Sequence, residues 1–152
     1  MNVGSVLAAK GHDVVTVGPD AHVLDAADLM RRRDIGSLVV TDVRGELLGL
    51  LTEREVSRAF ATCSYRLVDM RVAQVMERSV LTCTPEDDVL AALALLTRGR
   101  TRHLPVLAHG RLCGIVTLAD LAKHRLQNLE LEVQVLRDLH LAHWGGSEPR
   151  VP

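Results

Sequence analysis

Two short segments of the sequence place a threonine three positions before a carboxylate, directly after an apolar run. Thr117 precedes Asp120 in GIVTLAD, and Thr52 precedes Glu55 in GLLTERE. If each threonine opens a helix, the unpaired backbone N–H groups there favour an anionic oxygen, and a carboxylate one turn later can accept hydrogen bonds from vicinal ribose hydroxyls. The spacing therefore suits a nucleotide. A plain helix N-cap with first-turn charge explains the same residues, and the sequence alone leaves that alternative open.

The two segments belong to an internal repeat. One residue is lost from a turn inside the second copy, where deletion is tolerated, so the offset between the copies falls from 66 to 65 positions. With only two copies, the repeat predicts a pseudo-symmetric pair that shares one core and not an extended solenoid. The matching blocks are residues 14–20 with 80–86, residues 49–52 with 114–117 and, at an offset of 69, residues 3–7 with 72–76.

Each copy predicts the same order of elements. A β-branched run that ends before a proline, at residues 14–17 and 80–82, predicts a short strand, and apolar residues at helical spacing follow it. Two strands around a turn come next, and a second helix begins at the threonine. The order is β-α-β-β-α, which predicts an α/β fold of the α+β type. The paired strands are expected at residues 37–41 and 47–51 in the first copy and at 103–107 and 112–116 in the second.

Composition excludes several classes of protein. The chain has 152 residues, 47% of them hydrophobic, and a formal net charge of −1, so it predicts a folded protein and gives no support to a basic nucleic-acid binder. One Trp, one Tyr and one Phe are too few to stack several bases. No apolar run approaches the length of a membrane span, and the three cysteines form no C-x-x-C pattern. We expect a cytoplasmic protein that contacts neither nucleic acid nor membrane.

Taken together, these motifs resemble the CBS domain, present as a tandem pair called a Bateman module. The resemblance rests on TVGPD at residues 16–20, on GSLVV and RHLPV at the second strand of each copy, and on GLLTERE and GIVTLAD at the third. It is most similar to small stand-alone bacterial members. The expected organisation is a first CBS motif at residues 3–62, a second at 72–126, a helical extension at 127–144 and a flexible tail at 145–152.

The resemblance implies clefts between the two motifs that bind adenine nucleotides or related adenosyl ligands, with no resident cofactor. In the first cleft, Ile35 and Val14 would flank the base, and Gly36 would permit close backbone approach. The residues that the resemblance assigns to this cleft are Thr117, Asp120, His12, Val14, Ile35, Gly36 and Ser37.

The second cleft departs from the family pattern, because Glu55 stands where the family has aspartate. Its additional methylene moves the carboxylate by about an ångström, so the sequence predicts a larger loss of binding for Asp120→Ala than for Glu55→Ala. Arginine suits bidentate phosphate contact, although a solvated strand end equally explains Arg102 and His103. The residues assigned to this cleft are Thr52, Arg54, Glu55, Arg78, Val80, Thr101, Arg102 and His103.

The C-terminal stretch predicts a long helix from Leu118 to about His143, because it contains neither Gly nor Pro and carries two adjacent apolar rows. Such a helix either packs against a second subunit, as the homodimers of the family imply, or folds back on its own module. His140 and His143 lie three positions apart, but no third ligand is evident, so no metal site is predicted.

No nucleophile-base pair or paired carboxylates are recognisable, so an enzyme is not predicted. The sequence favours a regulatory module that senses an adenine nucleotide and transmits its state to an unidentified partner protein. The alternative is a constitutive homodimerisation scaffold with vestigial clefts.

Overall fold

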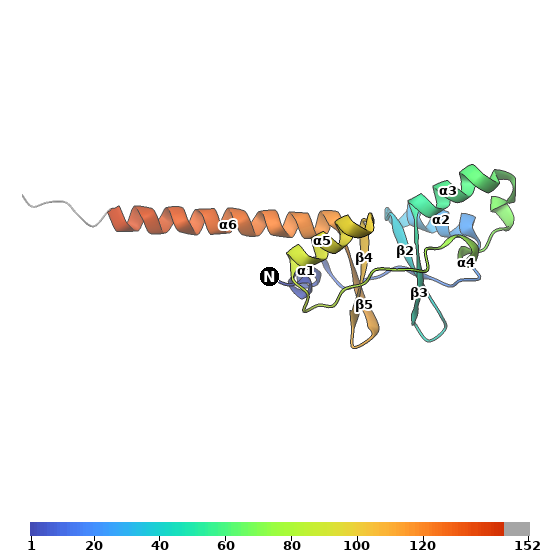
Figure 1. Ribbon diagram of the computed structural model, residues 1–152, viewed down its shortest axis with the longest axis horizontal. Helices are drawn as coiled ribbons and strands as arrows, with labels where there is room; N and C mark the ends of the chain where they lie inside the picture. The colour runs from blue at the N-terminus through green and yellow to red at the C-terminus, as the bar shows by residue number, and fades with distance from the viewer. Residues whose placement is uncertain (145–152) are drawn as a thin grey trace, which may run out of the picture.

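The computed structural model describes residues 1–144, so the tail expected at 145–152 lies outside the described residues. Two halves lie side by side, each with a small sheet, and one long helix projects from the second half (Figure 1). This arrangement confirms the α+β class and the two motifs that the repeat predicts.

In the first half, three strands form one sheet in the order β1-β2-β3. They are β1 (Thr16–Val17), β2 (Ser37–Thr41) and β3 (Leu47–Thr52), with β1 parallel to β2 and β2 antiparallel to β3. Helices α2 (Val23–Arg33) and α3 (Glu53–Cys63) pack on this sheet, and the short helix η1 (Ser64–Asp69) follows.

The second half has a two-stranded antiparallel sheet, in which β4 (His103–Ala108) pairs with β5 (Arg111–Thr117). Helix α5 (Val89–Gly99) precedes it, and α6 (Leu118–Trp144) follows. Helices α2 and α5 end alike, on Asp34 with φ 52° and Arg100 with φ 50°, both in the left-handed region that commonly closes a helix. The repeat is therefore visible in backbone detail as well as in sequence.

The first strand of each copy is shorter than predicted. Residues 14 and 15 precede β1, and the expected strand at residues 80–82 is absent. Only Cys83 keeps the pairing, with its N–H donating to Pro105 O at 3.1 Å and its carbonyl accepting from Leu107 N at 2.8 Å. The preceding residues instead leave the sheet edge, because Leu81 packs closely against Gly99 at the end of α5.

Two short helices each pack in the half that is formed by the other copy of the repeat. Helix α1 (Val3–Lys10), which precedes the first copy, packs in the core around β4 and β5, and α4 (Val72–Val75) packs in the core of the first half. Each needs a glycine on the strand beneath it. A Cβ at Gly114 would lie 2.7 Å from Leu7 Cδ2, and one at Gly49 would lie 2.6 Å from Met76 Sδ.

Helix α6 is 27 residues long and begins at the position that the sequence predicts. Leu121 is fully buried against the body, whereas the residues beyond Asn128 extend away from it (Figure 1). Within residues 1–144, no helix combines the length and the apolar character needed to cross a bilayer.

Candidate functional site

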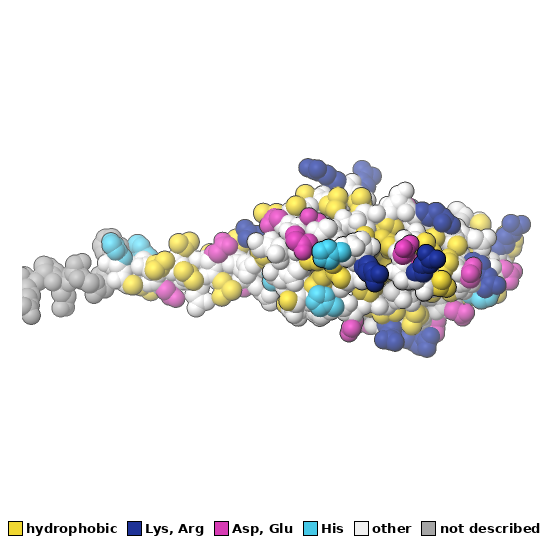
Figure 2. Space-filling model, turned by 90° about the horizontal axis from the view of Figure 1, so that it is seen from below, with side chains coloured by type: hydrophobic (Ala, Val, Ile, Leu, Met, Phe, Trp, Pro, Cys, Tyr) yellow, Lys and Arg dark blue, Asp and Glu magenta, His cyan; other side chains and the backbone are white. Residues whose placement is uncertain are grey.

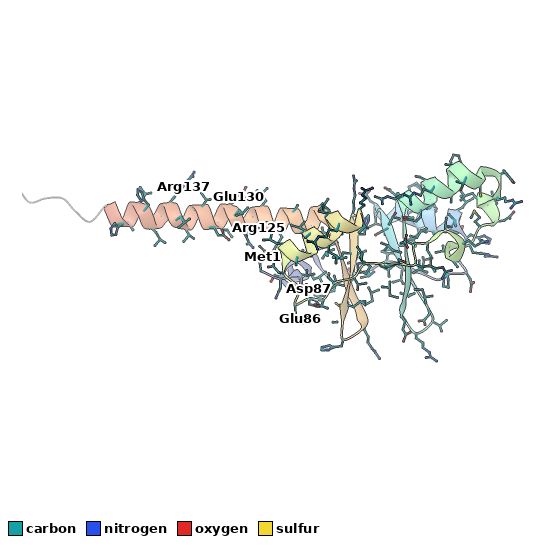
Figure 3. All side chains as sticks on the ribbon, in the orientation of Figure 1. Met1, Glu86, Asp87, Arg125, Glu130 and Arg137 are labelled. Carbon is teal, nitrogen blue, oxygen red and sulfur yellow. The ribbon has the colours of Figure 1, made fainter. Side chains whose placement is uncertain are left out.

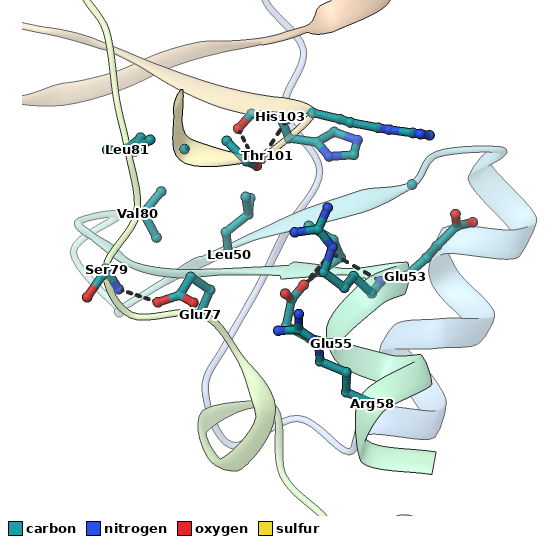
Figure 4. Close-up of a pocket in the computed structure, with 15 residues that line it drawn as sticks. Leu50, Glu53, Glu55, Arg58, Glu77, Ser79, Val80, Leu81, Thr101 and His103 are labelled. Carbon is teal, nitrogen blue, oxygen red and sulfur yellow. Dashed lines mark hydrogen bonds between the residues drawn. The ribbon is translucent and has the colours of Figure 1, made fainter. Parts of the chain in front are cut away.

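A cavity of about 390 Å³ lies where the two halves meet, and we call it the junction cavity (Figure 4). Its walls come from the end of β3 and the start of α3, from the segment after α4, and from the start of β4. Its size falls within the range of small-molecule sites. It is lined by Gly36, Leu50, Thr52, Glu53, Arg54, Glu55, Arg58, Glu77, Ser79, Val80, Leu81, Gly99, Thr101, Arg102 and His103.

Thr52 and Glu55 form the carboxylate end of the junction cavity. The N–H of Thr52 donates to Glu55 Oε2 at 2.9 Å, and the Thr52 hydroxyl donates to the same oxygen. Thr52 Oγ1 in turn accepts from Arg54 N at 3.2 Å. The longer side chain of glutamate therefore folds back to the helix start, so its additional methylene does not carry the carboxylate away from the site.

Three arginines line the same cavity. Arg54 Nη1 donates to the carbonyl of Arg100 at 2.8 Å and so links the two halves across the cavity. Arg58 lies one turn further along α3, and Arg102 comes from the segment before β4. Guanidinium groups bind phosphate oxygens well, so this cavity combines a carboxylate suited to a ribose with cations suited to a phosphate.

His103 lies at the top of the cavity in Figure 4, at the start of β4. Burial lowers its pKa; Glu53 and Glu55 act in the opposite direction, and Lys10 and Arg102 lower it further. A Cβ at Gly36 would lie 3.4 Å from His103 Nε2, an ordinary van der Waals contact, so Gly36 and His103 are close neighbours at the cavity.

The first predicted cleft is arranged differently. Thr117 N donates to Asp120 Oδ2 at 2.8 Å, and Asp120 N donates to Thr117 Oγ1 at 3.1 Å, which is a reciprocal helix cap. Lys10 Nζ also lies 2.6 Å from Asp120 Oδ2 and donates to Ile115 O at 2.9 Å. Burial raises the pKa of Asp120, but the hydrogen bonds from Lys10 and Thr117 together lower it by more. The pKa of this carboxyl therefore lies below its usual value.

The remaining residues assigned to the first predicted cleft come from the segment before β1 and from the start of β2. His12 Nδ1 donates to Cys113 O at 3.1 Å, Val14 is half-buried before β1, and Ser37 is buried at the start of β2. Ile35 lines a neighbouring hollow between α2 and α3, whereas Gly36 lines both this hollow and the junction cavity.

Of the residues predicted for the second cleft, Arg78 alone does not line the junction cavity, because its Nη2 atom donates to Ala73 O at 2.9 Å.

Some residues that line the junction cavity were not predicted, although the sequence carries a signal for them. Arg58 follows Arg54 by four positions, so both lie on one helical face. Ser79 and Leu81 flank the predicted Val80. The lining residues missed are Leu50, Glu53, Arg58, Glu77, Ser79, Leu81 and Gly99.

Among the described residues, no group of three or more His, Cys, Asp and Glu side chains is arranged to hold a metal ion.

Two pseudo-symmetric α+β motifs that enclose a shared cavity define a tandem repeat module. A family model described as "CBS domain" matches residues 3–62 and again residues 72–127. The chain therefore belongs to the CBS domain family, as a tandem pair.

Relatives and solved structures agree with this assignment. The CBS-domain containing protein ATU1752 from Agrobacterium tumefaciens superposes with a TM-score of 0.80 at 38% identity, over 82% of this chain and 99% of that one. The CBS domain-containing protein YhcV of Bacillus subtilis is 31% identical over 126 residues, which are 83% of this chain and 89% of that protein. In both comparisons the chain spans most of the length of the matched protein.

One structural neighbour carries ligands. The CBS domain pair of protein MJ0100, in complex with 5′-methylthioadenosine and S-adenosyl-L-methionine, superposes with a TM-score of 0.74 over 84% of this chain and 98% of that one. The sequence identity is 21%, so this likeness shows the shared fold.

Proposed function

We propose that this chain is a non-catalytic regulatory module that binds an adenine nucleotide, or a related adenosyl ligand, in the junction cavity. The observation that carries the proposal is the placement of the Thr52–Glu55 pair and three arginines around one ligand-sized space between the halves. The adenosyl ligands bound by MJ0100 support it, because that protein has the same fold.

The lining residues suggest how the ligand lies. The Glu55 carboxylate, already at the helix start, accepts hydrogen bonds from ribose hydroxyls, and Arg54, Arg58 and Arg102 contact phosphate oxygens. Leu50 and Val80 offer apolar surface to the base. We place the preferred site in this second cleft and not at Asp120, whose carboxylate already has an ion-pair partner in Lys10.

Regulation follows from the position of the cavity. A ligand that contacts both halves favours one relative arrangement of them by the difference between its affinities for the two, typically about 1 to 3 kcal/mol. An unidentified partner protein would recognise that arrangement. We further propose a homodimer in the cytoplasm, without a resident cofactor.

A thermal-shift panel with AMP, ADP, ATP, NAD and S-adenosylmethionine tests the proposal. A ligand at 100 times its dissociation constant stabilises the folded state by about 2.7 kcal/mol, which is readily measured as a higher melting temperature. At least one adenine ligand should raise it, and guanosine monophosphate serves as the matched control. If none does, the alternative of a constitutive homodimerisation scaffold with vestigial clefts replaces the proposal.

A further inference from the structure

The outer part of α6 carries an apolar seam that its own chain leaves uncovered. Leu126, Leu129, Val133 and Leu136 recur at alternating spacings of three and four residues, and all four are exposed, from 40% at Leu129 to 66% at Leu136. Figure 2 shows hydrophobic side chains along this projecting helix. The spacing is that of the a and d positions of a coiled coil. We name these four residues the α6 seam.

The body of the molecule leaves the seam uncovered. Where α6 rests on its own module, Leu121 is fully buried, whereas Ala119 and Ala122, which continue the seam pattern toward the start of the helix, are exposed. A second helix can therefore approach the seam along its length without displacing the module. The seam also lies almost wholly beyond residue 127, where the match to the family ends, so the CBS fold itself does not account for it.

The charged residues on the two sides of the seam match those of an identical helix. Arg125 and Glu132 take the g positions, and Glu130 and Arg137 take the e positions. Figure 3 labels Arg125, Glu130 and Arg137 along the helix, and Arg125 Nη1 lies 3.7 Å from Glu132 Oε1 on the g edge.

In a parallel, in-register pair of these helices, each g residue faces the e residue five positions later on the other copy. Arg125 then faces Glu130, and Glu132 faces Arg137, so all four pairs across the symmetric dimer have opposite charges. If one helix is shifted by one heptad along the other, like charges meet. A shift in one direction sets Arg125 against Arg137 of the other copy, and a shift in the opposite direction sets Glu132 against Glu130. Charge therefore selects a single parallel register.

We propose that the α6 seam is an interface with a second copy of this chain, formed by parallel, in-register pairing of the two α6 helices. Val133 at an a position between Leu129 and Leu136 at d positions is typical of a two-stranded coil. The inference specifies how the homodimer is held and does not depend on a ligand, because the seam lies outside the junction cavity.

Oxidative cross-linking of the full chain tests the pairing. Cys63 and Cys113 are replaced by Ser, whereas Cys83 is kept, because it is buried and burial raises its pKa to about 12. Leu129→Cys should yield a disulfide-linked dimer, since facing d positions come within disulfide reach. The matched control Leu131→Cys, which is also exposed but lies off the seam, should cross-link several-fold less.

Charge reversal in the Leu129→Cys background tests the register. Glu130→Arg should greatly reduce the cross-link, and adding Arg125→Glu should restore it. In contrast, Glu130→Arg with Arg137→Glu makes all four parallel pairs repulsive and should abolish it.

Three results would each overturn the proposal: no cross-link at residue 129, equal cross-linking at residues 129 and 131, or no effect of charge reversal on the cross-link. An antiparallel pair sets residue 129 opposite residue 140 when Glu130 faces Arg137, so it gives no cross-link at residue 129. Because nucleotide-induced stabilisation is measured separately, failure here leaves the ligand proposal standing.

Discussion

The Nζ atom of Lys10 lies 2.6 Å from Oδ2 of Asp120, although 110 positions separate them in the chain. The equivalent carboxylate of the first copy, on Glu55, has no ion pair among the described residues and lines the junction cavity. The repeat has therefore produced two similar helix caps with different electrostatic surroundings, and the Thr52–Glu55 cap lines a ligand-sized space.

From this difference we expect the opposite ranking of the two clefts to the one that the sequence suggests. Glu55→Ala should weaken AMP binding about tenfold or more, because hydrogen bonds to a charged group contribute about 1.5 to 3 kcal/mol. Asp120→Ala should leave affinity nearly unchanged. Isothermal titration calorimetry of both variants checks this, and a larger loss for Asp120→Ala would restore the original ranking.

Lys10→Met should lower stability in a pH-dependent way. The folded pKa of Asp120 lies below its usual 3.8, so its stabilising effect is present above pH 3.8 and is lost as the pH falls through the lower folded value. The free energies of unfolding of wild type and variant should therefore differ at pH 6 and converge once the pH is below the folded pKa of Asp120. Urea denaturation across this pH range measures the difference. A difference that stays constant with pH would show that Lys10 acts only through packing and its bond to Ile115 O.

His103 should titrate below its usual pKa of 6.5, since burial disfavours the imidazolium. Its contribution to stability is complete above pH 6.5 and declines as the pH falls through the folded value. An anionic nucleotide in the junction cavity should raise this pKa, because negative charge favours the protonated ring. An NMR titration of the His103 ring protons, with and without AMP, checks both statements. An identical midpoint in saturating AMP would place the phosphate elsewhere.

Gly49→Ala and Gly114→Ala should each destabilise the fold by about 1 to 3 kcal/mol. The new methyl group at residue 114 meets Leu7, which is fully buried and has no space to move, and at residue 49 it lies 2.8 Å from the carbonyl oxygen of Glu77. Gly18→Ala is the matched control, because nothing lies within 4 Å of the added atom. Chemical denaturation compares the three variants. Equal stabilities would contradict the close approach of α1 and α4 to the strands.

Much of the fold could be predicted because each local signal occurs twice. The pattern of two strands around a turn predicted β2 at residues 37–41 as observed. The helical spacing of Val23, Ala26, Ala27 and Met30 marked residues of α2 that are buried, apart from the half-buried Ala27. The missing strand at residues 80–82 shows the limit of such reasoning. Strand propensity there is overridden by the packing of Leu81 on Gly99, a tertiary contact with no local signature.

The site was predictable only in part for the same reason. The repeat and the family resemblance together grouped Thr52, Glu55, Thr101 and His103, which line one cavity. Sequence spacing carries no information on which carboxylate a distant lysine contacts, so the ion pair of Asp120 with Lys10 could not be foreseen.

Nucleotide binding in the junction cavity is tested most directly by a crystal of this protein soaked with AMP. We expect electron density for the nucleotide in the junction cavity, with ribose hydroxyls at the Glu55 carboxylate and the phosphate near Arg54, Arg58 or Arg102. Density beside Thr117 and Asp120 instead, or a junction cavity that remains free of nucleotide at saturating concentration, would contradict this expectation.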